Sequence, residues 1–102
     1  MVKLEEITEY AAKIGARFHP EKIVLFGSQA RGITHRDSDV DLLVIMPFEG
    51  KGMRKALEIV LAVEAPFPLD LIVRQPYQVH SRVERRDFFL QDVMDEGIVV
   101  YE

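Results

Sequence analysis

Cysteine is absent from this sequence of 102 residues, and its absence excludes disulfide bonds and thiolate metal sites. The sequence also lacks any apolar run that approaches the roughly 18 to 20 residues of a membrane-spanning helix. An excess of positive charge is missing as well, because the formal net charge is −4. Without a basic face, binding of a nucleic-acid backbone is not expected to be the main task of the protein. These absences favour a cytoplasmic protein that acts on something other than nucleic acid.

What is present is enough for one packed domain over residues 1–102, since 48% of the residues are hydrophobic. The pattern of apolar residues predicts an α/β, or α+β, fold in which a small mixed β-sheet is flanked by helices. Strands are expected at 23–26, 40–45, 69–73 and, as an edge strand, 98–101, and helices at 3–16, 53–64 and 81–95, the last beginning at Ser81.

The rest of the chain is organised around the stretch from Ile23 to Ile45, IVLFGSQARGITHRDSDVDLLVI. Its first hydrophobic run stops at Gly27 and Ser28, where the chain must turn sharply. Its second run is preceded by a polar loop that delivers Asp39 and Asp41. Residues two apart on a strand point to the same face, so these two carboxylates are expected side by side. Hard oxygen ligands of this kind suit Mg²⁺ or Mn²⁺.

A third carboxylate, Asp70, interrupts the apolar segment PLDLIV. A carboxylate buried there without a partner would be costly, so a neighbouring group is expected. If this strand lies beside the second one, Asp70 faces Asp39 and Asp41, and the three could hold two metal ions about 3.5 to 4 Å apart. The alternative is that Asp70 simply faces water at the end of a strand. Taken together with the aspartate pair and the turn, the catalytic interpretation is favoured.

Phosphate binding is the second expected property of the central stretch. Gly27 lets the backbone approach a phosphate closely, a short helical piece at 29–31 would point its amides outward, and Ser28 adds a hydroxyl. Arg31 could reach phosphate oxygens, although a structural ion pair with a nearby acid is an equal alternative. Ser38 could bind phosphate or cap the loop.

The spelling GSQARGITHRDSDVDLLVI resembles the nucleotidyltransferase signature of the DNA polymerase β superfamily, and in particular its small prokaryotic branch, which includes the MntA-type antitoxins. The resemblance extends over most of the chain. It implies Mg²⁺-dependent transfer of AMP from ATP, with Asp39, Asp41 and Asp70 as metal ligands and catalytic residues. It also implies triphosphate contacts at Gly27 and Ser28.

The same resemblance implies a partner, because larger relatives carry a helical domain for which this chain has no room. The expected partner is a HEPN-type toxin, HepT, whose tyrosine would receive AMP in a type VII toxin–antitoxin system; a homodimer is the other way to complete the site. Two alternatives retain the nucleotide pocket. In one, the protein binds a nucleotide and neutralises its partner by occlusion, without catalysis; in the other, it transfers the nucleotide to a small hydroxyl compound. The residues that could form an interface are Arg82, Arg85, Arg86, Phe88 and Phe89, and a solvated helix face is the plainer interpretation of them.

Overall fold

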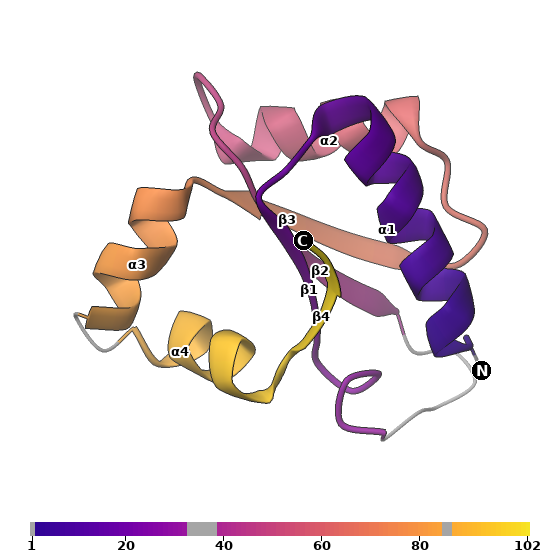
Figure 1. The fold of residues 1–102 in the computed structure, drawn as a ribbon. Helices are drawn as coiled ribbons and strands as arrows, with labels where there is room; N and C mark the ends of the chain where they lie inside the picture. Colours follow the sequence, from indigo (N-terminus) through magenta and orange to yellow (C-terminus); the bar gives the residue numbers. More distant parts are fainter. Residues whose placement is uncertain (1, 33–38, 85–86) are drawn as a thin grey trace.

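The computed structural model describes residues 2–32, 39–84 and 87–102, and for residues 82–84 it describes the backbone alone. A sheet of four strands, in the order β3-β2-β1-β4, lies between two layers of helices (Figure 1). Helices α1 and α2 cover one face and α3 and α4 the other. The predicted mixed sheet flanked by helices is therefore confirmed. The elements are α1 (Leu4–Phe18), β1 (Lys22–Phe26), β2 (Val40–Ile45), α2 (Gly52–Ala62), β3 (Leu69–Arg74), α3 (Pro76–Glu84), α4 (Phe88–Glu96) and β4 (Ile98–Tyr101).

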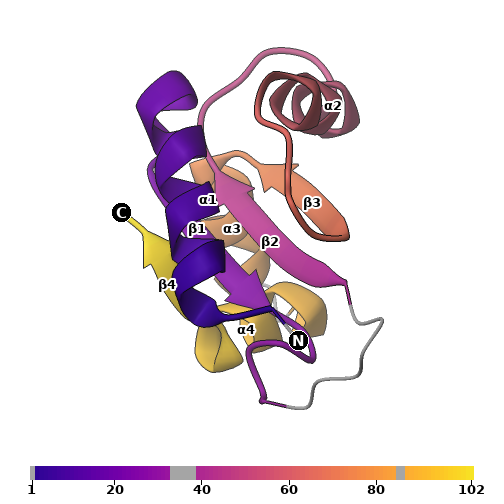
Figure 2. The ribbon, with the colours of Figure 1, turned by 90° about the vertical axis from the view of Figure 1, so that its right-hand side faces the viewer.

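Pairing within the sheet is mixed: β1 runs antiparallel to β2 and to β4, whereas β2 and β3 are parallel. A parallel pair needs a crossover connection, and α2 supplies it on the face that α1 also covers (Figure 2). The third strand does lie beside the second, the arrangement in which the three aspartates can meet. The fourth strand closes the sheet as an edge strand, as predicted.

Alternation along the strands divides the core between the two layers. On β2, Leu42 and Val44 face α1 and α2, whereas Leu43 and Ile45 face α3 and α4. All four are buried, which is typical of a central strand covered on both faces. Across the described residues, none of the helices combines the length and apolar character needed to cross a membrane.

The helix predicted to start at Ser81 and run to residue 95 is wrong, because the structure has two helices there. Ser81 lies inside α3, which begins at Pro76, a residue whose fixed φ suits a first helical turn. The second helix, α4, starts at Phe88 and is capped by Asp87, whose carboxylate accepts hydrogen bonds from the amides of Phe89 and Leu90, at 3.1 and 3.2 Å. An N-cap of this kind begins a new helix, and apolar spacing alone does not reveal it.

Candidate active site

The turn after β1 begins at Gly27, which has a positive φ of 76°. The amide of Arg31 donates to the Gly27 carbonyl at 3.2 Å, and Gly32, with a φ of 73°, ends the turn. Residues 28–32 therefore form a hydrogen-bonded turn rather than the short helical piece that was predicted. Two left-handed glycines so close together leave too few residues for a helix, so the anion-binding potential lies in the turn itself.

Asp41 lies directly against this turn. In the antiparallel register it pairs with Phe26, the residue before Gly27. A Cβ on Gly27 would lie only 2.3 Å from Oδ2 of Asp41, so the absence of a side chain is what lets the carboxylate approach. The glycine turn therefore lies against one member of the aspartate pair, Asp41.

Asp70 lies beside Asp41 in the parallel register of β2 and β3. Asp41 is partly buried, while Asp39 and Asp70 are exposed. Burial raises the pKa of Asp41 above its ordinary value, and the negative charges of Asp70 and then Asp39 raise that pKa further. The structure therefore brings the three predicted carboxylates to one end of the sheet, close enough to repel one another.

This donor set fits a hard divalent cation, which would relieve the repulsion that raises the pKa of Asp41. Within the described ranges, no group of three or more carboxylate or imidazole side chains is already arranged around a common metal position.

The other predicted residues have different outcomes. Arg31 forms an ion pair with Asp92 of α4, with 2.7 Å between Nη2 and Oδ2, so the structural alternative for this arginine is the one observed. Ser28 is partly buried in the turn. Ser38 lies outside the described residues, as do the side chains of Arg82, Arg85 and Arg86.

Sequence reasoning missed an aromatic wall next to the glycine turn. Phe26 and Phe89 meet edge to face, with their ring centroids 5.7 Å apart. Together with Gly27, Arg31 and Asp92 they line a hollow of about 220 Å³. Phe26 and Asp41 are paired across the hairpin, so the sequence could have indicated that both side chains lie on the same face of the sheet. The position of α4 against Phe26 could not be predicted, because it depends on the break before α4.

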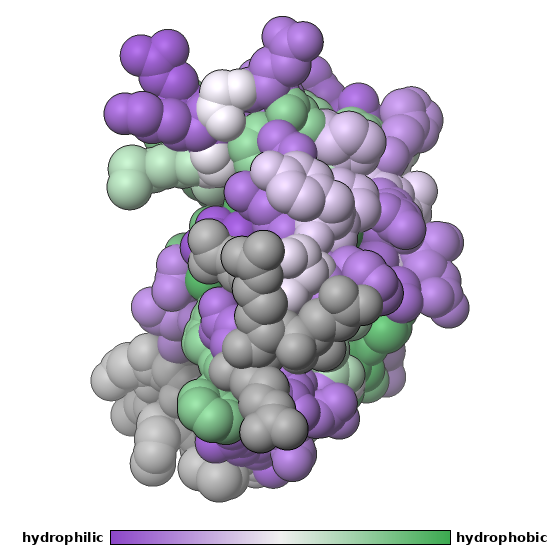
Figure 3. Space-filling model, turned by 90° about the vertical axis from the view of Figure 1, so that its left-hand side faces the viewer, coloured by the Kyte–Doolittle hydropathy of each residue, from purple (hydrophilic) through white to green (hydrophobic). Residues whose placement is uncertain are grey.

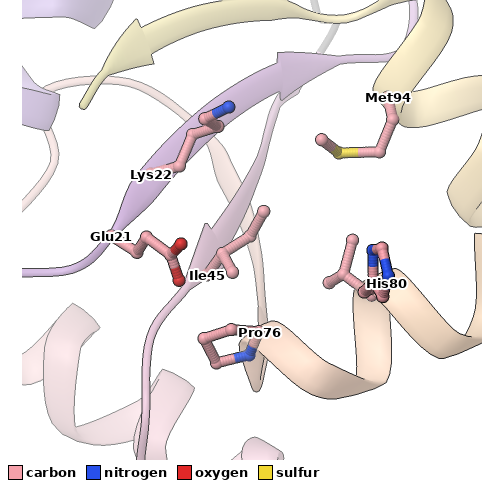
Figure 4. Close-up of a pocket in the computed structure, with 7 residues that line it drawn as sticks. Glu21, Lys22, Ile45, Pro76, His80 and Met94 are labelled. Carbon is pink, nitrogen blue, oxygen red and sulfur yellow. The ribbon is translucent and has the colours of Figure 1, made fainter.

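A second hollow, of about 270 Å³, lies at the opposite end of the sheet (Figure 4). Ile45, Pro76, His80 and Met94 surround it, and none of the three aspartates lines it. Its walls are mostly apolar and come from α3, α4 and the ends of β1 and β2 that lie away from the three aspartates. This hollow does not belong to the candidate site.

Comparisons with known proteins agree with this geometry. The profile of a family described as a nucleotidyltransferase domain matches residues 4–100. Among proteins with curated functions, none matches the sequence significantly.

Three solved structures share the fold. A protein from Sulfolobus solfataricus, proposed to be a nucleotidyltransferase, is 19% identical with a TM-score of 0.63, covering 94% of this chain and 77% of that one. A toxin–antitoxin structure with AMP-PNP is 21% identical with a TM-score of 0.57, covering 98% and 73%. An MntA–HepT toxin–antitoxin mutant, in which two aspartates two positions apart are replaced by glutamate, is 18% identical with a TM-score of 0.54, covering 98% and 73%. At these identities the likeness establishes the fold alone.

Proposed function

Because this chain belongs to the nucleotidyltransferase domain family, we propose that it transfers AMP from ATP to a hydroxyl group. The observation that carries this proposal is the contact between the Gly27 turn and Asp41, with Asp70 alongside in register. A turn able to accept phosphates and a set of carboxylates able to hold a cation meet at one point. Nucleotidyl transfer needs that combination, because both the triphosphate and the attacking hydroxyl must be held there.

Asp39, Asp41 and Asp70 would hold magnesium, two ions being the expected number. When bound, magnesium neutralises the triphosphate and lowers the pKa of the attacking hydroxyl. Gly27 and Ser28 would hold phosphate oxygens, the first through its open backbone and the second through its hydroxyl. In the transfer, the acceptor hydroxyl releases its proton to solvent, its oxygen forms a bond to the α-phosphorus, the bond from that phosphorus to the bridging oxygen breaks, and pyrophosphate leaves.

Arg31 and Ser38 remain candidates for contacts with the triphosphate. Arg31 is half-exposed in its ion pair with Asp92, so an incoming phosphate would compete with that carboxylate for the guanidinium. An exposed ion pair contributes less than about 1 kcal/mol, so Arg31 could exchange Asp92 for a phosphate at little cost in free energy.

Metal dependence of nucleotide binding is the first test. Calorimetry with ATP should show binding in the presence of Mg²⁺ and weakening of at least about tenfold when a chelator is added, since unscreened carboxylates repel a triphosphate. Equal affinity in chelator would argue against a metal site at the three aspartates.

For the acceptor, we propose a tyrosine on a separate protein, a toxin of the HEPN type. Support comes from the toxin–antitoxin structures that share the fold, one with AMP-PNP and one with two aspartates replaced. The phenol suits the chemistry, because its pKa near ~10 makes it easier to deprotonate than an aliphatic alcohol. The net charge of −4 favours approach of a basic, RNA-binding partner.

Intact-mass spectrometry decides between acceptors. The protein is incubated with ATP, Mg²⁺ and the polypeptide that co-purifies with it, and that polypeptide should gain about 329 Da for each AMP. Labelling of a small hydroxyl compound or of an RNA end instead would overturn the tyrosine assignment. If the partner is silenced without any change of mass, the protein acts by occlusion.

A further inference from the structure

The outer side of β3 is a free edge of the sheet. This strand stands at the end of the strand order, so within the described ranges no strand pairs with its outer side. On its inner side, the carbonyls of Pro68 and Arg74 accept from the amides of Val40 and Met46, at 2.9 and 3.1 Å. Backbone groups alternate in direction along a strand, so the amides and carbonyls of the odd-numbered residues must point away from β2. These residues are Leu69, Leu71 and Val73.

Only the first part of this edge is open. The carbonyl of Val73 accepts from Nη1 of Arg74 at 2.9 Å. Gly52, at the start of α2, lies so close that a Cβ on it would be 2.8 Å from the same carbonyl oxygen. Leu69 and Leu71 are therefore the residues whose outward amides and carbonyls a new strand could reach.

A recess of about 290 Å³ lies between this edge and α2. Met53 and Ala56 line it from the helix, and residues 70–74 line it from the strand. Met53 is 84% exposed, which is unusual for so large an apolar side chain. Figure 3 shows the molecule hollowed at its left margin, below the atoms of α2. Asp70 is among the residues that line the recess, so the recess and the candidate active site share this residue.

We propose that this recess receives an extended segment of the acceptor protein, which adds as a strand along Leu69 and Leu71 and brings its hydroxyl to Asp70. This inference rests on the proposed transfer to a protein. The free backbone groups specify a polypeptide rather than a small molecule, because they supply the main-chain hydrogen bonds of strand addition. Apolar walls at Met53 and Ala56 provide contacts for its side chains.

The charges at the two ends of the recess indicate what the segment carries. Asp70 and Arg74 lie four residues apart on β3, and residues separated by an even number point to the same face. They are about 13 Å apart at the usual rise of a strand. The hydroxyl belongs at the Asp70 end, and an acidic residue about four positions away on the segment would face the guanidinium of Arg74.

Two variants of the recess test the proposal, each with a comparison. Met53→Glu places a charge in the apolar wall, and Leu61→Glu places the same charge on the same helix, at a residue 76% exposed and outside the recess. Leu71→Pro removes the outward amide, while Leu71→Ala shortens the side chain but keeps that amide. Each protein is assayed for Mg²⁺–ATP binding by calorimetry and for transfer of label from [α-³²P]ATP to the co-purifying polypeptide.

Met53→Glu and Leu71→Pro should each lower transfer at least tenfold with nucleotide binding unchanged. Leu61→Glu should transfer at the wild-type rate, and Leu71→Ala should lose several-fold less than the proline variant. Wild-type rates in Met53→Glu, or an equal loss in Leu61→Glu, would overturn the proposal, and these readouts hold even if Leu71→Pro does not fold. If the wild type labels no polypeptide at all, the failure is that of the proposed function.

Discussion

At the scale of single residues, Asp41 is where the parts of the candidate site meet. It contacts the glycine turn through the space a Cβ would fill, and it lies beside Asp70 across the parallel pair of strands. Its pKa is raised by burial and by its two acidic neighbours. Its charge is therefore a cost to the metal-free fold, a cost that binding of a cation would remove.

Replacing Gly27 by alanine should disturb this residue directly. The substitution forces a non-glycine residue into a φ of 76° and drives a Cβ into Oδ2 of Asp41. We expect a loss of about 1 to 3 kcal/mol in stability and a fall in transfer. Gly50→Ala is the matched control, since Gly50 has a φ of 80° but open space around it. Equal activity of the two variants, measured with equal unfolding temperatures, would mean that the contact with Asp41 has no role in the site.

Asp41→Asn should separate stability from activity. A raised folded pKa means that the folded state loses stability as pH rises from the ordinary value of 3.8 through the folded value, and asparagine avoids that loss. In chelator at pH 7 the variant should be as stable as the wild type or slightly more so, by at most about 1 kcal/mol. Transfer should fall at least about a hundredfold. Thermal unfolding at pH 7 and at acidic pH measures the stability, and the transfer assay measures the activity. A variant less stable than the wild type at pH 7 would contradict a raised pKa of Asp41.

At the scale of elements, the break between α3 and α4 determines what surrounds the glycine turn. Because α4 is a separate helix that starts at Phe88, it can bring Phe89 against Phe26 and Asp92 against Arg31. A single continuous helix, as the apolar spacing predicted, could not have followed this path. The aromatic wall and the ion pair of the site therefore depend on one helix cap.

Asp87→Ala should accordingly destabilise the protein by about 1 kcal/mol, because two amides at the start of α4 lose their acceptor. Asp87→Asn keeps an acceptor oxygen of the same reach and should cost a few tenths of that. Chemical denaturation of the three proteins measures the difference. If alanine and asparagine are equally destabilising, the effect of Asp87 comes from its charge and not from capping.

The strands were predictable where the helix break was not, and the reason is physical. The run from Val40 to Ile45 is largely apolar on both faces, which is typical of a central strand covered on both sides. This prediction does not depend on which helices cover the strand. The break at Asp87 depends on a side chain that also suits an exposed helix face, and the apolar residues that follow it fit either interpretation. The meeting of Asp41 with Asp70 was foreseeable once two strands were placed side by side, whereas the Arg31–Asp92 pair required the position of α4.

At the scale of the whole molecule, Tyr10 ties two distant segments together. Its hydroxyl donates to the carbonyl of Val63 at 2.7 Å, which joins α1 to the residue that closes α2. Burial raises the pKa of Tyr10 above 10.0. The neutral phenol is favoured in the folded state, so its contribution is fully present below the ordinary pKa and is lost as pH rises through the folded value.

Tyr10→Phe should therefore be less stable at neutral pH by about 0.5 to 1.5 kcal/mol, because a buried carbonyl loses its donor. The deficit should shrink as the pH passes about 10. Melting temperatures of both proteins from pH 7 to 11 measure this, with Tyr77→Phe, at an exposed residue, as the control. A deficit independent of pH would show that the phenol does not ionise before the protein unfolds.

The crossover between β2 and β3 has a consequence for how the protein folds. Asp39 and Asp41 belong to a local hairpin, whereas Asp70 joins them only after the chain from 46 to 68 has returned across the sheet. Closing that long loop costs chain entropy before the hydrogen bonds between β2 and β3 can form. The local contacts of the β1–β2 hairpin are therefore expected to form before the parallel pair. A ribosome-bound chain that ends before β3 would carry two of the three carboxylates. Under the proposed function, the site for the cations would thus be completed late in synthesis, and an unfinished chain would be inactive.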